Sequence, residues 1–206
     1  MKKLSIFSLM AILAVCIYVV FTLVAILNYP LPYSPLTNWL SDFGNPTRNP
    51  AGAIFYDAGG ILTSAVLVLF FAGMYKWNTG DKKVKVFLLL SQISGIVFAI
   101  SFIMSALFPL GINDSVHSVF SIMLFIFIGF FEIFSASAIR RNPSSPKWTA
   151  YFGFVAVMIN FAFGVSFNFM NLFIGEWIII AVFIAYVITL ALTQSVHQKE
   201  DALKKA

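Results

Sequence analysis

One histidine and three aspartates are the side chains best able to do chemistry in this chain of 206 residues. His117 follows Asp114 by three residues, and Asp42 and Asp57 precede both. A histidine beside carboxylates can act as a general base, bind a divalent metal ion or form a structural ion pair. The second histidine, His197, lies in a basic tail, so any histidine chemistry depends on His117.

The three roles make different demands on the rest of the chain. As a general base, His117 would be oriented by an aspartate and would activate Ser41 or a water molecule. A zinc site needs more histidine or cysteine than this sequence offers, because Cys16 is its only cysteine. A nucleophile elbow, a zinc-protease helix motif and a phosphate-binding loop are all absent. We therefore predict no metal and no cofactor, while acid–base chemistry and a structural pair both stay open.

The composition indicates the environment in which these groups work. Apolar residues make up 60% of the chain and charged residues 10%, against about 25% charged residues in an ordinary soluble domain. This balance excludes soluble and disordered proteins. The positions of the basic residues, described below, explain the net charge of +5 better than nucleic-acid binding does, so we expect no nucleic-acid partner.

Six apolar runs are long enough to cross a bilayer, which takes about 20 helical residues. Their apolar residues are continuous rather than alternating, which favours helices over barrel strands. The runs cover residues 4–27, 53–75, 84–108, 116–139, 148–167 and 172–193. The predicted fold is an all-α integral membrane protein, a six-transmembrane-helix bundle that forms a single domain over residues 1–206.

The basic residues orient this bundle. Twelve of the 13 lysines and arginines fall before the first run, in the second and fourth loops or in the tail at 194–206. Only Arg48 falls on the other side. Because positive charge stays cytoplasmic, both termini are predicted inside the cell and the protein in the plasma membrane.

The first outer loop is predicted to contain a short helix lying in the membrane interface. Its apolar residues recur with the spacing of one helical face: Leu36, Trp39, Leu40 and Phe43. Ser34 and Gly44 would bound the helix. Its polar residues would face away from the lipid, namely Asn38, Ser41, Asp42 and Asn45.

Ionisable residues near the outer ends of the spans are expected to converge on one outward-facing pocket beneath that helix. The candidate catalytic residues are His117, Asp42, Asp57 and Asp114. The candidate ligand-binding residues are Asn38, Ser41, Asn45 and Arg48.

Two further polar residues, Glu132 and Asn160, lie inside the fourth and fifth runs. A carboxylate at bilayer depth costs about 2.5–3.5 kcal/mol or more. We therefore expect Glu132 to face the bundle interior and to bond to a Ser or Asn side chain of a neighbouring span. The alternative partners are Tyr75, Lys83 and Lys85 near the inner surface. The first and sixth runs carry few polar residues and are expected at the periphery.

Short motifs along the chain resemble those of a known family. Residues 38–46 read NWLSDFGNP, residues 53–60 read AIFYDAGG, and Phe108-Pro109 precedes His117. The pattern resembles the archaeal and bacterial family called domain of unknown function 998, and more distantly it is similar to the Frag1/DRAM/Sfk1 six-span proteins. The resemblance implies a six-helix bundle with the Ser-Asp loop and the histidine as shared features. It brings no established reaction, although the distant relatives are linked to lipid handling and membrane trafficking.

These inferences predict a protein that binds a membrane lipid or another amphiphile in its outer pocket. The first alternative is a membrane-embedded lipid hydrolase that uses His117 with Asp42, Asp57 and Asp114. The second is a small transporter or an assembly subunit of a membrane complex. No oligomeric state follows from the sequence.

Overall fold

The computed structural model describes residues 4–30, 32–170 and 172–205, and for residues 165–170 and 194–205 the backbone alone. The described residues form six α-helices and two short 3₁₀ helices, with no strand, which confirms the all-helical class. The α-helices are α1 (Ile6–Leu27), α2 (Ala53–Gly73), α3 (Lys82–Leu107), α4 (Asp114–Arg141), α5 (Lys147–Met170) and α6 (Ile174–Lys205). The 3₁₀ helices are η1 (Leu40–Gly44) and η2 (Met74–Trp77).

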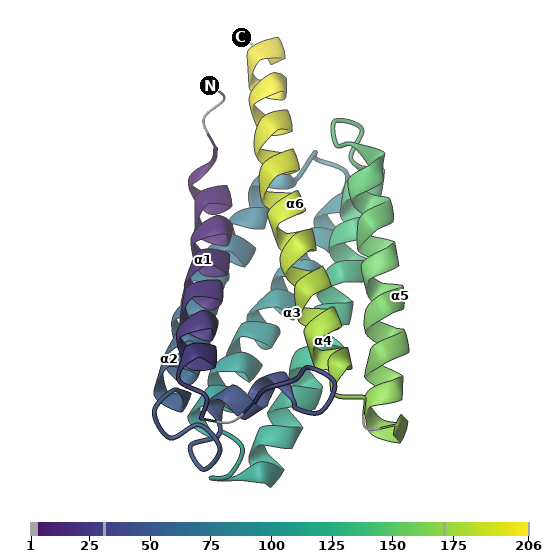
Figure 1. Cartoon of the computed structure of the whole chain (residues 1–206). Helices are drawn as coiled ribbons and strands as arrows, with labels where there is room; N and C mark the ends of the chain where they lie inside the picture. Colours follow the sequence, from purple (N-terminus) through teal and green to yellow (C-terminus); the bar gives the residue numbers. More distant parts are fainter. Residues whose placement is uncertain (1–3, 31, 171, 206) are drawn as a thin grey trace.

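The helices form a closed ring in chain order. Each packs against the next along the chain, and α1 packs against α6. In Figure 1, α1 begins and α6 ends at the same end of the bundle, here called the terminus end. The first loop (residues 28–52) lies at the opposite end, here called the loop end.

Five helices of the described part of the chain are long and apolar enough to cross a membrane: α1, α2 with η2, α3, α4 and the Ile174–Thr193 part of α6. The fifth helix, α5, is not among them. The helix ends fall within three residues of the predicted runs, except that α6 continues to Lys205 where a tail was predicted.

Aromatic rings from four helices fill the centre of the bundle. The ring of Phe71 (α2) lies 5.0 Å from that of Phe131 (α4), and the ring of Phe98 (α3) lies 4.8 Å from that of Phe183 (α6), between centroids. The peripheral position expected for the sixth span is wrong. In its most apolar stretch of 18 residues, 44% of the residues of α6 are buried, against 28% for α1. A span without polar residues suits an apolar core as well as lipid. The absence of polar residues therefore could not distinguish a central helix from a peripheral one.

A tight turn brings α3 and α4 together at the loop end. Gly111 adopts a positive φ of 83°, which favours glycine, and its N–H donates to Asp114 Oδ1 at 2.6 Å. Asn113 caps α4 by accepting from the N–H of Val116 at 3.2 Å. A Cβ at Gly111 would collide with the side chain of Asn45, so the first loop packs closely on this turn.

The first loop is more compact than the predicted interfacial helix. A turn starts at Ser34, whose backbone oxygen accepts from the N–H of Asn38 at 2.9 Å, and the five-residue η1 follows. Phe43 is fully buried, in contact with aromatic side chains of the loop, α2 and α6. Of the predicted apolar face, Leu40 and Phe43 therefore pack on protein, whereas Leu36 is exposed.

Candidate functional site

A groove of about 880 Å³ lies between α4 and α5 and ends at the first loop. Its walls are mainly apolar and include Ile126 and Phe130 on α4 and Val157 and Phe161 on α5. Phe130 and Phe161 are 46% and 73% exposed, so the groove opens on the side of the bundle.

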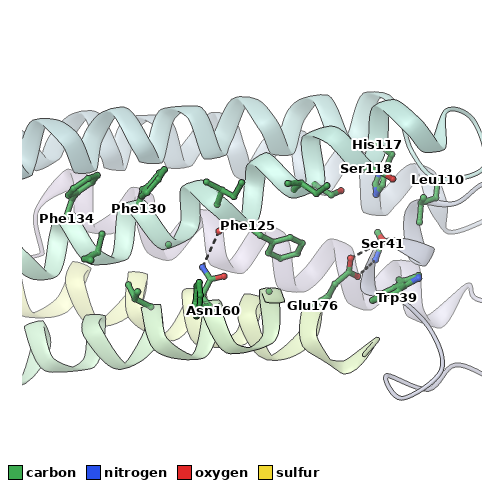
Figure 2. A pocket seen from close by; sticks show the side chains of 18 residues that line it. Trp39, Ser41, Leu110, His117, Ser118, Phe125, Phe130, Phe134, Asn160 and Glu176 are labelled. Atoms are coloured by element: carbon green, nitrogen blue, oxygen red, sulfur yellow. Dashed lines mark hydrogen bonds between the residues drawn. The ribbon is translucent and has the colours of Figure 1, made fainter. Parts of the chain in front are cut away.

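Most polar residues of the groove gather at one end, while Asn160 lies farther along it. Figure 2 shows Ser41, His117, Ser118 and Glu176 near one another at the loop end, whereas Phe130 and Phe134 lie farther along α4. These four residues are called the polar end below. A long apolar channel with polar groups at one end matches the shape and polarity of an amphiphile.

His117 is held by the end of α3. Its Nδ1 lies 3.1 Å from the backbone oxygen of Ser105 and 3.2 Å from that of Phe108. Backbone oxygens only accept hydrogen bonds, so Nδ1 of the neutral ring carries the proton and Nε2 is an acceptor. The side chain is 6% exposed, and Nε2 has no hydrogen-bond partner among the residues described.

Glu176 joins the first turn of α6 to the first loop. Its Oε2 accepts from the N–H of Ser41 at 3.2 Å, and its Oε1 accepts from the Ser41 hydroxyl at 3.5 Å. Glu176 is 5% exposed and lines the groove. The Ser41 hydroxyl is thus directed to a carboxylate rather than to His117.

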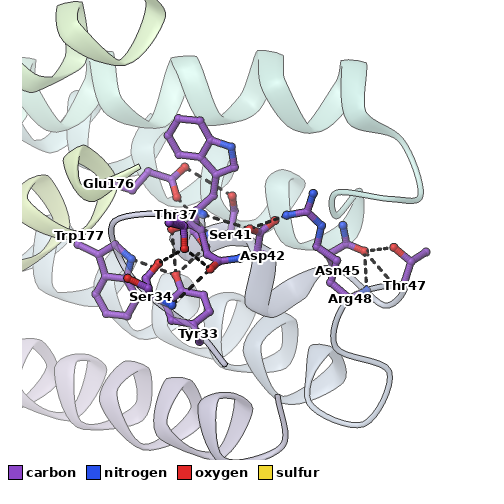
Figure 3. A network of polar contacts seen from close by, with 12 residues as sticks. Tyr33, Ser34, Thr37, Ser41, Asp42, Asn45, Thr47, Arg48, Glu176 and Trp177 are labelled. Atoms are coloured by element: carbon purple, nitrogen blue, oxygen red, sulfur yellow. Dashed lines mark hydrogen bonds and ion pairs between the residues drawn. The ribbon is translucent and has the colours of Figure 1, made fainter. Parts of the chain in front are cut away.

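Tyr33 anchors the loop beside this contact, as Figure 3 shows. Its hydroxyl donates to the backbone oxygen of Trp39 at 2.7 Å and accepts from the Trp177 indole N–H at 3.1 Å. Burial raises the pKa of Tyr33, so the phenol stays protonated and keeps its donor role. The segment that carries Ser41 is therefore fixed from both sides.

Three of the predicted ligand-binding residues, Asn38, Asn45 and Arg48, bond to other residues of the same loop. Asp42, 1% exposed, accepts from the guanidinium of Arg48 at 2.8 Å and from the N–H of Trp39 at 3.1 Å. The side-chain oxygen of Asn45 accepts from the N–H of Thr47 at 2.9 Å. That of Asn38 accepts from the Thr37 hydroxyl at 3.0 Å. These contacts give the residues a role in shaping the loop.

The other two aspartates lie at the same end but apart from the His117 ring. The carboxyl of Asp57 lies against Gly44, and that of Asp114 caps the turn at Gly111. No hydrogen bond joins Asp42, Asp57 or Asp114 to His117 in the described structure, although all four lie at the loop end. Within that part of the chain, no cluster of three His, Cys, Asp or Glu side chains suits a metal ion.

Glu132 and Asn160 lie deeper in the bundle. Glu132 is fully buried, and neither carboxyl oxygen has a hydrogen-bond partner among the described side chains. Asn160 of α5 is close enough to influence that carboxyl, yet its Nδ2 donates to the backbone oxygen of Phe125 at 3.2 Å. Asn160 also lines the groove.

Two residues that shape this region were missed from the sequence. Glu176 opens an apolar run, where it resembles an interfacial charge, and its partner Ser41 is 135 residues away. Asn49 is fully buried and donates to the backbone oxygens of Ala25 and Phe43, at 3.2 and 3.0 Å. Asparagine in a proline-rich loop indicates only a turn, so no local signal marks Asn49 as a bridge between α1 and η1.

Comparison with known proteins yields one family. The family model described as "Protein of unknown function (DUF998)" matches residues 12–194, from α1 into α6. This match confirms the resemblance to that family found in the sequence motifs. Searches of curated proteins and of solved structures returned no match.

Proposed function

We propose that this chain, which belongs to the DUF998 family of proteins of unknown function, binds a membrane lipid or another amphiphile in the groove between α4 and α5. The family brings no reaction with it, so the proposal depends on the groove. The observation that carries it is the gathering of polar groups at one end of a channel with apolar walls.

The dimensions of the groove support this proposal. Its volume of about 880 Å³ lies in the range of about 300–1,000 Å³ usual for ligand sites. From His117 to Phe134 the lining of α4 extends over roughly 25 Å, at 1.5 Å per residue. An apolar chain would lie along α4, with its polar head at Ser41, His117 and Glu176.

The geometry favours binding over hydrolysis. A triad-like site needs a nucleophile and an orienting carboxylate on the two sides of the histidine. Here Nδ1 of His117 faces backbone oxygens, Asp42 bonds to Arg48, and the Ser41 hydroxyl bonds to Glu176. Asp42 and Ser41 thus have other partners, and no nucleophile bonds to Nε2 of His117 among the described residues.

Filling the groove tests the proposal. A Cβ at Gly129 would meet only Asn160 Nδ2, at an ordinary contact distance of 3.4 Å, so Gly129→Leu adds bulk to the lining without breaking a packed contact. We expect the wild type, examined by native mass spectrometry after mild detergent extraction, to retain a lipid adduct. Gly129→Leu should lose most of it.

Val155→Leu is the matched control, because Val155 is 49% exposed on α5 and lies outside the groove lining. It should retain the adduct. Equal adducts in wild type and Gly129→Leu, with both proteins folded, would rule out the groove as the binding site.

The proposal includes a six-span topology in the plasma membrane, in which α5 crosses the membrane together with the other five helices and both termini are cytoplasmic. Two observations support it: α1 begins and α6 ends at the terminus end, and 10 of the 11 basic residues in the described part of the chain belong to segments of that end. The first loop and the polar end of the groove would then face outward, with η1 at the outer interface.

Accessibility of introduced cysteines tests this orientation. In a Cys16→Ala background, Ile112→Cys at the loop end should react with an impermeant thiol reagent added to intact cells. Thr79→Cys at the terminus end should react only after the cells are opened. Both positions are exposed. Labelling of Thr79→Cys in intact cells would reverse the proposed topology.

A further inference from the structure

The loop end of the molecule carries an excess of acidic groups. Four carboxyl side chains lie there: Asp42, Asp57, Asp114 and Glu176. Of the sequence segments between the helices at this end, 28–52, 108–113 and 171–173, only the first contains a basic residue, Arg48. Its guanidinium is already paired with Asp42 at 2.8 Å. A ligand at the polar end therefore meets negative charge that no cation of these segments offsets.

Glu176 is the acidic group nearest to a ligand, because it lines the groove. Its hydrogen bonds come from uncharged donors of the first loop, the N–H and the hydroxyl of Ser41 at 3.2 and 3.5 Å and the backbone of Leu40. No ion pair with Glu176 occurs among the described side chains. A buried carboxylate without a cation strongly attracts a positively charged partner, since the attraction between opposite charges grows as water is excluded.

His117 supplies a second acceptor at the same end. Its Nδ1–H donates to the backbone oxygens of Ser105 and Phe108, so Nε2 is an acceptor, and this atom is buried without a partner among the described residues. The nearby hydroxyl of Ser118 donates to the backbone oxygen of Asp114 at 2.7 Å. The polar end thus offers acceptors, and its hydroxyl donors at Ser41 and Ser118 are already used.

We infer that the groove selects an amphiphile whose head is a protonated primary amine without an adjacent phosphate; this inference rests on the proposed function. An ammonium group has three donors and no acceptor, so it can satisfy Glu176 and His117 together. A hydroxyl head has one donor and no charge. A phosphate or carboxylate head would place negative charge beside Glu176 and Asp42.

Three probes that share one tail test the inference: dodecylamine, dodecanol and dodecyl phosphate. Binding to the full-length protein in phosphatidylcholine nanodiscs is measured at pH 7 as mass-spectrometric adducts and as a shift in melting temperature. We expect dodecylamine to bind about tenfold more tightly than dodecanol, and dodecyl phosphate to bind more weakly than both. Glu176→Gln should weaken dodecylamine binding about tenfold and dodecanol binding much less, because the hydroxyl head carries no charge.

Gly129→Leu separates failure of this inference from failure of the proposed function. The proposed function itself is overturned if the wild type binds none of the three probes. It is also overturned if Gly129→Leu leaves the binding of all three unaffected. Binding that Gly129→Leu abolishes but that is tightest for dodecanol or dodecyl phosphate leaves the groove intact and overturns the amine head. The amine head is also overturned if folded Glu176→Gln binds dodecylamine as the wild type does. Should Glu176→Gln not fold, the order of the three probes on the wild type decides.

Discussion

Replacing Phe43 by alanine is expected to lower the free energy of unfolding by about 3–5 kcal/mol, the usual cost of emptying a buried aromatic site. The ring is fully buried and stacks on Tyr33 with centroids 4.2 Å apart. It also contacts Tyr29, Tyr56 and Trp177, at centroid distances of 5.6 to 6.0 Å. No neighbouring side chain can fill the space without giving up its own hydrogen bond or stacking contact.

The measurement is the melting temperature of the purified protein, with Leu36→Ala as control. Leu36 belongs to the same loop but is 71% exposed, so its removal should change the melting temperature little. Phe43→Ala should also release η1 and with it the contact between Ser41 and Glu176, so lipid retention should fall together with stability. Equal melting temperatures for the two variants would show that the loop does not depend on this aromatic cluster.

The helices were predictable because bilayer thickness sets their length. A run of about 20 apolar residues has few other uses, so the predicted runs and the observed helices end within three residues of each other, except at the C-terminal end of α6. The position of a helix in the ring was not predictable in the same way. The apolar side chains of α6, among them Phe183 and Tyr186, would suit lipid as well as the core that they occupy.

The candidate site was predicted only in its location. Asp42, Asp57, Asp114 and His117 do lie at one end of the bundle, because orientation and span ends fix that much. Their partners depend on loop conformation: Arg48 reaches back six residues to Asp42, and Ser41 meets Glu176 across 135 residues. No periodic pattern records such contacts, and the groove itself depends on how α4 and α5 pack beside the first loop.

Glu132 shows how a missing partner reverses an expectation. The sequence predicts a carboxyl held by neighbouring polar side chains, yet neither oxygen is bonded in the described structure. A buried polar group without a partner costs about 1–3 kcal/mol. Glu132→Leu keeps a similar volume and removes that cost, so we expect the free energy of unfolding to rise by about this amount.

Ser135→Ala, one turn farther along α4, should act in the opposite direction. The Ser135 hydroxyl donates to the backbone oxygen of Phe131 at 2.7 Å and accepts from the hydroxyl of Tyr186 at 2.9 Å, so alanine leaves a fully buried phenol unpaired. Its expected loss is about 1–3 kcal/mol. The measurement is the melting temperature of the wild type and the two variants in one detergent. Glu132→Leu should melt above the wild type and Ser135→Ala below it. A Glu132→Leu variant that melts below the wild type would mean that the carboxyl is bonded in the folded protein, with the side chain of Asn160 as its partner.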